Sequence, residues 1–314
     1  MKALMIDRFP ENFRHALNSR LELAEYYPGR SRAEILAKLP EVDILVMNSR
    51  IKLNKEAIDL AKKLKLVVRA GVGMDHIDVP YLKEKGIRVE NTKGGNADAV
   101  GEHTVGMLLN MRHHLHRANL EVKQFGWNRE KNRGWEIGGK TIGLIGYGHT
   151  GKSVAKKLSG FGCRVLAYDK YLKDYTDSYA TQAEMDDLYQ QAEVISMHVP
   201  LTAETRSMAN YAFFSNFKKP IFFLNLARGP IVNIADLIQS MEEGRVLATS
   251  LDVLPNEKMD QLTNEERSLY EKLFSMENVF VSPHIGGWTH ESLENINQMI
   301  LSFVDELLEK PESN

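Results

Sequence analysis

The sequence predicts an α/β fold with two doubly wound parallel sheets, that is, two Rossmann-like domains. Short apolar runs alternate with amphipathic helical segments from the N-terminus onward, which is the pattern of βαβ units. Residues 140–169 add a strand, a glycine-rich turn, a helix and a second strand in direct succession. The length of 314 residues is sufficient for roughly two domains.

Composition excludes several classes of protein. Forty Lys and Arg residues face 42 Asp and Glu residues, a formal net charge of −2, so we expect no nucleic-acid or membrane partner. The one cysteine, Cys163, allows neither an intramolecular disulfide nor a Cys-based zinc site, and we interpret it as a packed small residue. Residues 1–7 do not form a signal peptide, and no apolar run is long enough to span a bilayer. These features favour a cytoplasmic protein.

The first 95 residues alternate between strands and helices and predict an α/β domain of their own. Ser31 is a candidate N-cap, and Glu34 at the third helical position would complete a capping box. Strands are expected at residues 3–6, 22–26, 44–47, 66–69 and 87–90, and helices at 12–18, 32–39 and 55–62.

A long, largely buried helix from residue 97 to 112 follows, and we expect it to join the two domains. Residues 125–139 are expected to form an exposed loop over the sheet. About six strands are then expected, the number typical of a dinucleotide-binding fold. They lie at 141–145, 164–168, 192–200, 221–226, 248–253 and 279–282, with helices after the glycines and at 235–244 and 291–308.

Three glycines at G-x-G-x-x-G spacing predict a dinucleotide site. Gly146 permits a tight turn, Gly148 allows the backbone to approach a pyrophosphate, and Gly151 allows the helix to pack against the sheet. Asp169 lies 18 residues after the last glycine, where it would accept hydrogen bonds from a ribose 2′-hydroxyl and repel a 2′-phosphate. NAD is therefore expected as the cofactor. A methyltransferase-type or purely structural α/β turn is the alternative.

Three polar residues follow strands of this second domain: Arg228, Glu257 and His284. Ligands bind beyond the carboxyl ends of strands in an open α/β sheet. Hydride transfer to or from an alcohol needs an acid/base, for which His is suited, and a carboxylate that orients the imidazole. A guanidinium can hold a substrate carboxylate at two points. Taken alone, Arg228 or His284 would also fit a structural role. Together with Glu257, the two residues predict an oxidoreductase.

Ordered motifs along nearly the whole chain resemble the D-isomer-specific 2-hydroxyacid dehydrogenases. The resemblance implies an NAD-dependent enzyme for a small 2-hydroxy or 2-oxo acid, and a homodimer formed through the helix after Ala97. It also implies a flavodoxin-like substrate domain of residues 1–97 and 286–314, interrupted by an NAD domain of residues 98–285. The motifs are Ala70-Gly-Val-Gly with Asp75 and Ile77-Asp78, Val100-Gly-Glu-His-Thr104, the glycine loop with Asp169, His198-Val-Pro-Leu-Thr202, Asn225-Leu-Ala-Arg-Gly-Pro-Ile-Val232, Leu251-Asp-Val-Leu-Pro-Asn-Glu257 and Ser282-Pro-His-Ile-Gly-Gly287.

The same resemblance implies a role for each matching residue. Arg228 would bind the substrate, Glu257 would pair with the histidine, and His284 would be the acid/base. Implied cofactor contacts are Thr104, Gly146, Gly148, His149, Thr150, Gly151, Asp169, His198, Val199, Pro200, Thr205, Ala227, Asp252 and Gly286. Implied substrate contacts are Arg69, Val72, Gly73, Lys93, Arg228 and His284. The chain departs from the family pattern at Gly101, Lys258 and Trp288, and the last two bear on the shape of the pocket.

Arg69, directly before Ala-Gly-x-Gly, is similar to the phosphoglycerate dehydrogenase branch of the family. There it would neutralise a phosphate, with Lys93 adding charge, so 3-phosphoglycerate and 3-phosphohydroxypyruvate are the leading substrates. The alternative is a reductase of glyoxylate, hydroxypyruvate or 2-oxo acids in general, with Arg69 in a structural role. The sequence printed here ends at Asn314, and we expect no feedback through an appended regulatory module.

Two other interpretations remain. An NAD(H)-sensing binding protein of the same fold would need the nucleotide site without turnover, but the complete Arg, Glu and His set favours an enzyme. His113, His114 and His116, with His103 upstream, suggest a metal site. On a helix, however, only 113 and 116 share a face, and no acidic residue stands at ligand spacing. We therefore expect no metal.

Overall fold

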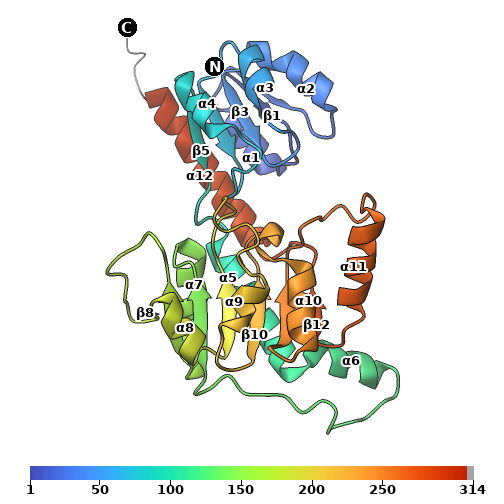
Figure 1. Ribbon diagram of the computed structural model, residues 1–314. Coiled ribbons are helices and arrows are strands. Elements are labelled where there is room, and N and C mark those ends of the chain that lie inside the picture. The colour runs from blue at the N-terminus through green and yellow to red at the C-terminus, as the bar shows by residue number, and fades with distance from the viewer. Residues whose placement is uncertain (310–314) are drawn as a thin grey trace. The chain divides into compact units, whose positions relative to one another are not determined.

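The computed structural model describes residues 1–309 and contains two units (Figure 1). The terminal unit comprises Met1–Asn96 and Thr289–Asn314, and the central unit comprises Ala97–Trp288. The predicted domain limits, residues 97 and 286, differ from these by one and three residues. Residues 310–314, the end of the predicted substrate domain, lie outside the described residues.

A parallel five-stranded sheet forms the centre of the terminal unit, in the order β2-β1-β3-β4-β5. This strand order is that of flavodoxin-like folds, as predicted. The strands are β1 (Lys2–Met5), β2 (Leu23–Tyr26), β3 (Ile44–Met47), β4 (Leu66–Arg69) and β5 (Arg88–Asn91). Unbroken apolar runs made β3 and β4 predictable to the residue, because a strand buried on both faces has no polar side to present.

Helices cover both faces of this sheet. One face carries α2 (Arg32–Lys38), α3 (Lys55–Leu60) and α4 (Val79–Glu84), and the other carries α1 (Glu11–Asn18) and α12 (His290–Glu309). A short 3-10 turn, η1 (Leu39–Glu41), follows α2. The capping box predicted at Ser31 is present, with Glu34 at its third position. Helix α4 was not predicted, although Asp78 caps it and Pro80 stands in its first turn.

The central unit contains a parallel seven-stranded sheet in the order β12-β11-β10-β9-β6-β7-β8. Renumbered from β6, this is the dinucleotide-binding order 3-2-1-4-5-6 with one further strand. The strands are β6 (Thr141–Ile145), β7 (Arg164–Tyr168), β8 (Thr181–Gln182), β9 (Val194–Met197), β10 (Ile221–Asn225), β11 (Val246–Leu251) and β12 (Val279–Val281). The prediction of about six strands missed β8, whose two residues contain no apolar run.

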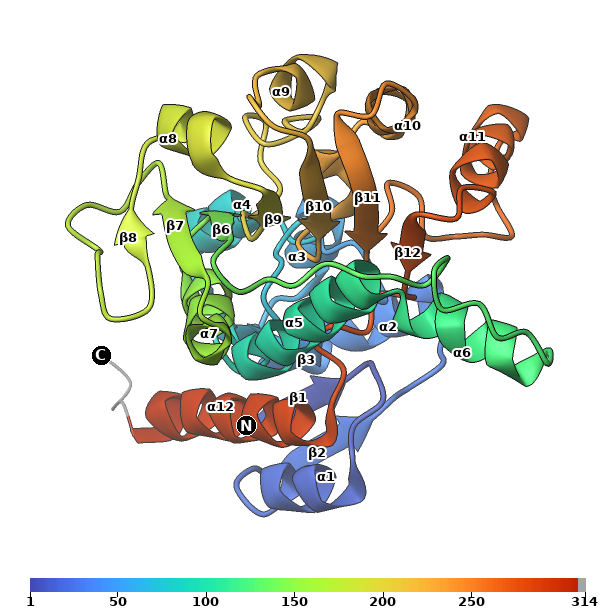
Figure 2. The same ribbon diagram turned by 90° about the horizontal axis from the view of Figure 1, so that it is seen from below.

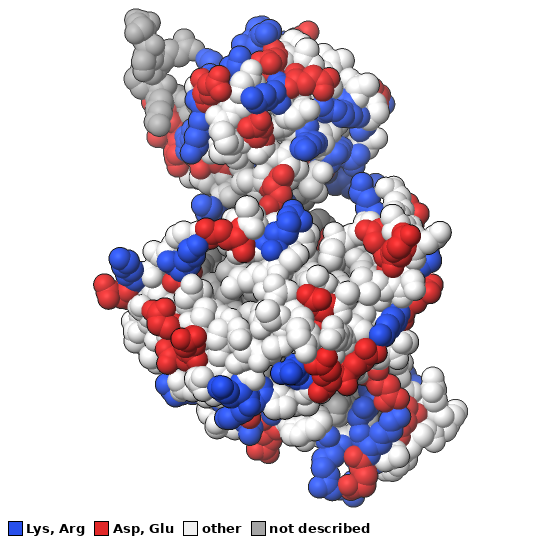
Figure 3. Space-filling model, viewed as in Figure 1, with Lys and Arg blue, Asp and Glu red and all other residues white. Residues whose placement is uncertain are grey.

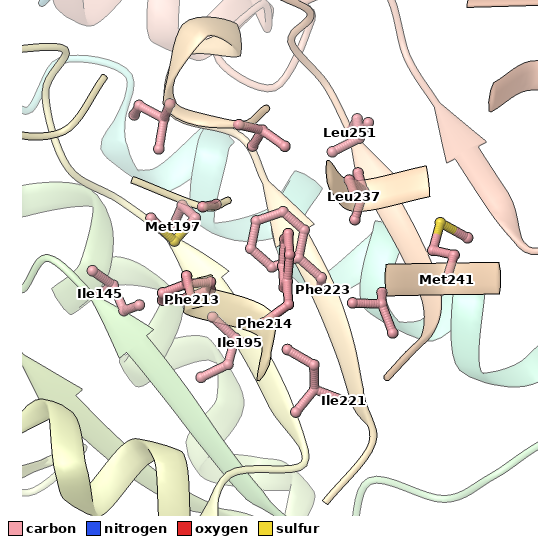
Figure 4. Close-up of a cluster of buried hydrophobic side chains, with 14 of the residues drawn as sticks. Ile145, Ile195, Met197, Phe213, Phe214, Ile221, Phe223, Leu237, Met241 and Leu251 are labelled. Carbon is pink, nitrogen blue, oxygen red and sulfur yellow. The ribbon is translucent and has the colours of Figure 1, made fainter. Parts of the chain in front are cut away.

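Two layers of helices enclose this sheet, as Figure 2 shows. Helices α5 (Ala97–His113) and α7 (His149–Leu158) lie on one side. The other side carries α8 (Met185–Gln191), α9 (Tyr211–Ser215), α10 (Ile234–Glu242) and α11 (Asn264–Phe274). Figure 4 shows how Phe213 and Phe214 of α9 and Leu237 of α10 pack over Phe223 of the sheet. Short 3-10 turns are η2 (Ser159–Phe161) and η3 (Gly229–Ile231).

The long helix predicted from residue 97 ends at His113, because His114 takes a left-handed conformation with φ of 53°. The chain then forms α6 (Leu115–Lys123). The loop predicted at 125–139 does lie over the sheet near its end, where the ring of Trp135 meets Phe222 edge-on. The buried guanidinium of Arg112 holds this part of the loop by donating to the carbonyls of Trp135 and Glu136 at 3.2 and 2.6 Å.

Charges of both signs are interspersed over the face shown in Figure 3, in keeping with the near-neutral composition. None of the helices within residues 1–309 is both long enough and apolar enough to cross a membrane.

Candidate active site

The glycine loop forms a cradle at the carboxyl end of β6. Gly146 has φ of 98°, and a Cβ there would lie 2.5 Å from the carbonyl oxygen of His198. A Cβ on Gly151 would lie 2.2 Å from the carbonyl oxygen of Gly146, so α7 packs against the turn only because this residue is glycine. Gly148 faces open space and caps α7 without a side-chain acceptor, which leaves the first N–H groups of that helix available. The cradle fits a pyrophosphate.

Asp169 holds this cradle from the end of β7. One carboxylate oxygen accepts a hydrogen bond from the Tyr147 N–H at 2.9 Å. The other accepts from the N–H groups of Tyr171 and Leu172 at 3.0 and 3.1 Å. Asp169 therefore joins the glycine loop to the turn that follows β7, a structural role that its predicted function at the ribose did not include.

The loop after β9 borders the cradle on its other side. His198 is largely buried; its Nε2 lies 2.9 Å from the hydroxyl of Ser196, and burial lowers its pKa to about 4. Its imidazole is therefore neutral at neutral pH. Thr205 donates to the carbonyl of Pro200 at 2.7 Å and accepts from the Thr202 N–H at 2.8 Å, which closes the turn. Of the other predicted contacts here, Val199 and Thr150 are half-buried and His149 is exposed.

The side chains of His284 and Glu257 contact each other, as predicted from the sequence. His284 Nδ1 lies 2.9 Å from Glu257 Oε2, and both side chains are about half exposed, at 48% and 44%. His284 has φ of 57°, a left-handed conformation that is uncommon for residues other than glycine. Its N–H donates to the carbonyl of Asp252 at 2.8 Å. Since Nδ1 faces the carboxylate, Nε2 is the ring nitrogen left for a ligand.

Asp252 is buried and holds the turn that carries His284. Its carboxylate accepts from the Ser282 hydroxyl at 2.6 Å and from the N–H groups of Ile285 and Gly286 at 2.9 and 2.8 Å. His103, from α5, lies 3.1 Å from the Ser282 hydroxyl and 3.6 Å from the carboxylate. Burial raises the pKa of Asp252, but these hydrogen bonds outweigh it and leave the pKa lowered. His103 and Ser282 stand in motifs that carry the family resemblance, but no role in this network was predicted for them.

Arg228 lies in a tight loop after β10. The buried side chain of Asn225 fixes this loop, because it accepts from the Ala227 N–H at 3.0 Å and donates to the Arg228 carbonyl at 2.9 Å. One guanidinium nitrogen of Arg228 donates to the carbonyl of Ala227 at 2.7 Å. A Cβ on Gly229 would lie 2.0 Å from the backbone of Leu254, so this loop and the one leading to Glu257 are in direct contact.

Helix α11, which was not predicted, supports the Glu257 loop. The Tyr270 hydroxyl accepts from the Asn256 N–H at 2.9 Å and donates to the Asn256 carbonyl at 3.2 Å. The Asn256 side chain donates to Glu266, also from α11, and accepts from the Lys258 N–H. A capping box of Thr263 and Glu266 begins this helix, and this T-x-x-E pattern was the signal available in the sequence.

Four predicted substrate residues belong to the terminal unit. Arg69 is half-buried and donates from Nη1 to the carbonyl of Ala70 at 3.0 Å. A Cβ on Gly71 would lie 1.3 Å from that Nη1, so the guanidinium folds over Gly71 because no side chain is present. The carbonyl of Val72 accepts from the Asn91 side chain at 2.7 Å, while Gly73 is half-buried and Lys93 exposed.

The remaining predicted residues have structural contacts. Thr104 is buried, and its hydroxyl donates to the carbonyl of Val100 within α5. Cys163 is partly buried, and burial raises the pKa of its thiol, as expected of a packed residue.

Of the histidines considered as metal ligands, His114 packs edge-on against Trp135. Within residues 1–309, no group of three His, Cys, Asp or Glu side chains is arranged to hold a metal ion.

Residues 105–286 match the family described as D-isomer specific 2-hydroxyacid dehydrogenase, NAD binding domain. The chain is 38% identical over 263 residues to a hydroxypyruvate reductase of Thermotoga maritima, covering 84% of each protein. It is 32% identical over 287 residues to a D-3-phosphoglycerate dehydrogenase of Methanocaldococcus jannaschii, covering 90% of this chain and 53% of the relative. The chain thus spans about half the length of that phosphoglycerate dehydrogenase.

A solved structure gives the same result for the whole fold. The D-lactate dehydrogenase of Aquifex aeolicus, determined in complex with NAD and lactic acid, superposes with a TM-score of 0.86 at 27% identity. The alignment covers 98% of this chain and 95% of that one. The strand orders, the glycine cradle and these matches lead to one conclusion: the chain belongs to the D-isomer-specific 2-hydroxyacid dehydrogenase family of NAD-dependent oxidoreductases.

Proposed function

We propose that this protein uses NADH to reduce a small 2-oxo acid to the D-2-hydroxy acid, with hydroxypyruvate as the leading substrate. The observation that supports the chemistry is the His284–Glu257 pair on a fixed turn of the domain that contains the glycine cradle. Nicotinamide, when bound, would supply or accept the hydride. The side chains of the protein must then bind the acid and move one proton.

In this proposal His284 is the acid/base. In reduction, Nε2 would donate a proton to the oxygen of the 2-oxo group, and in oxidation it would take that proton back. Glu257, 2.9 Å from Nδ1, would orient the ring and stabilise its protonated form. Arg228 would bind the carboxylate and polarise the oxo group, since a guanidinium suits two-point binding.

The choice of substrate depends on Arg69. The sequence favoured 3-phosphohydroxypyruvate, because a guanidinium beside the Ala70–Gly73 loop would neutralise a phosphate. In the structure this guanidinium folds over Gly71 and donates to a backbone carbonyl, which supports a role in holding the loop. The 38% identity to a hydroxypyruvate reductase over 84% of its length supports the unphosphorylated substrate. Exposed Lys93 and the relatives named phosphoglycerate dehydrogenase keep the phosphorylated acid as the second candidate.

The test is kcat/KM with NADH for hydroxypyruvate, glyoxylate, pyruvate and 3-phosphohydroxypyruvate, in the wild type and in Arg69→Met. We expect the unphosphorylated acids to be the better substrates, and the variant to lower kcat/KM for all four by a similar factor. A phosphate preference that is lost selectively in Arg69→Met would instead assign the phosphorylated substrate. A phosphate–guanidinium pair contributes about 1.5–3 kcal/mol, so that loss would be roughly 10- to 100-fold.

We also propose that the protein is a cytoplasmic homodimer that pairs through α5, α6 and the loop that follows. No residue of α6 is buried in the single chain. Its exposed apolar side chains, with those of the loop to residue 135, are Leu115, Leu120, Val122, Phe125, Trp127 and Trp135. Such a cluster is unusual on the surface of a monomer and is typical of an interface. The single, partly buried cysteine suits a reducing compartment.

A further inference from the structure

Three side chains form a clasp beside the glycine cradle: Lys170, Tyr171 and Glu204. Lys170 Nζ lies 2.6 Å from Glu204 Oε2, and the Tyr171 hydroxyl donates to the same oxygen at 3.0 Å. Lys170 and Tyr171 follow β7, whereas Glu204 follows β9. Because the strands run in the order β9-β6-β7, the clasp connects the loops on either side of the strand that leads into the cradle. This is the switch point at which such folds bind dinucleotides.

Hydrogen bonds between side chains and backbone N–H groups fix the turn at each end of the clasp. Asp169 accepts hydrogen bonds from the N–H groups of Tyr171 and Leu172. The candidate ribose acid therefore also fixes the backbone of the turn that carries Lys170. On the other side, Thr202 and Thr205 exchange hydrogen bonds across the turn that contains Glu204. The contact is therefore built from two defined turns that face each other.

The turn after β7 carries a cation directly beside the candidate ribose acid. A cation close to the acid that ends the second strand is the kind of group that accommodates the 2′-phosphate of NADP. This chain has such a cation, Lys170, directly after Asp169. The hydrogen bond to Glu204 raises the pKa of Lys170, and the same bond lowers the pKa of Glu204, so both are ionised and pair at neutral pH.

We infer that Glu204 is a cofactor-specificity residue that keeps the ammonium group of Lys170 from the 2′-phosphate of NADP. Asp169 repels the phosphate directly, and Glu204 neutralises the cation that directly follows Asp169 in the turn. This inference rests on the proposed binding of the adenosine ribose at Asp169. It does not depend on which 2-oxo acid is reduced.

The test measures the Kd of NADPH and of NADH by isothermal titration calorimetry, without any oxo acid, for wild type and Glu204→Gln. We expect the Kd of NADPH to fall about fivefold, which corresponds to the ~1 kcal/mol upper value of an exposed charge pair. The Kd of NADH should stay within about twofold. Adding Lys170→Met to Glu204→Gln should return the Kd of NADPH to the wild-type value, because the freed cation is gone.

Two controls separate this effect from others. Glu193→Gln removes the same charge from another Lys–Glu pair of this sheet, Lys140–Glu193 at 3.3 Å, which joins the residues just before β6 and β9, at the edge of the sheet opposite the clasp. It should leave both Kd values unchanged. Tyr171→Phe removes the tyrosine hydrogen bond to Glu204 but keeps the Lys170–Glu204 pair, so it should also leave the ratio of the Kd values of NADPH and NADH unchanged.

The inference is overturned if Glu204→Gln leaves the Kd of NADPH unchanged, or if either control lowers it equally. If the wild type binds NADH and reduces hydroxypyruvate but Glu204→Gln does not change the Kd of NADPH, this inference alone is refuted. A wild type that does not bind NADH would refute the proposed function as well.

Discussion

At the residue scale, the candidate site depends on the side chains that hold it as well as on Arg228, Glu257 and His284, the proposed reacting groups. The sequence suggested these three because each is a polar residue after a buried apolar strand. The buried Asp252 was predicted as a cofactor contact, yet the structure shows it bonded to Ser282 and to the turn around His284. Hydrogen bonds between residues far apart in the chain depend on tertiary packing, which periodicity does not encode.

A titratable residue supplies a prediction at the same scale. Burial lowers the pKa of His198 to about 4, against about 6.5 in an unfolded chain. Between these values the unfolded chain binds a proton at His198 that the folded chain does not, so the contribution of His198 to the free energy of unfolding falls as pH decreases from about 6.5 to about 4. Over the whole interval, a shift of this size lowers the free energy of unfolding by roughly 3 kcal/mol.

Urea unfolding of wild type and His198→Gln at several pH values measures this contribution. The variant should lose less stability than the wild type over that interval, with the two curves parallel above pH ~7. His149→Gln, which removes an exposed histidine, should behave as the wild type. Equal slopes for wild type and His198→Gln would show that the protonation of His198 is not linked to folding.

At the scale of elements, strands with continuous apolar runs were predicted to the residue, as for β6 and β7. Short elements were missed: β8 has two residues and α9 has five, too few to show a period. Helix α11 was also missed, although its capping box was visible. That omission matters because α11 holds Asn256, the neighbour of Glu257, through Tyr270 and Glu266.

Helix α6 and its loop carry the prediction at this scale. Phe125 is fully exposed and Trp127 is 80% exposed, and Figure 2 shows α6 extending past the edge of the sheet beyond β12. If these side chains form the proposed homodimer interface, Phe125→Asp with Trp127→Asp should place charges in an apolar contact and dissociate it. Sedimentation velocity should then show a monomer, whereas the wild type should sediment as a dimer.

The matched control is Leu60→Asp, which adds a charge at a partly exposed leucine of the terminal unit and should leave the dimer intact. A wild type that sediments as a monomer at micromolar concentration, or a double variant that remains dimeric, would rule out this interface.

At the scale of the whole molecule, the α/β class was predictable because strands and helices alternate throughout. The division into units was not contained in that alternation. The alternation of strands and helices continues through residues 96 and 97, where the first unit ends and the second begins. The apolar spacing of α12 does not indicate that this helix belongs to the terminal unit. Buried parallel strands look alike in sequence, so the discontinuous layout could be expected only from the family resemblance.

We propose that this chain reduces a 2-oxo acid with NADH and that His284 provides the proton. The most direct measurement compares hydroxypyruvate-dependent NADH oxidation, and the Kd of NADH, in wild type and His284→Asn. Asparagine tolerates the left-handed backbone at this position better than other residues, so the turn should be retained. If His284 is the acid/base, kcat should decrease about 10²- to 10⁴-fold in this variant, with the Kd of NADH nearly unchanged. Undiminished turnover in the variant, or no turnover in the wild type with any of the four oxo acids, would contradict it.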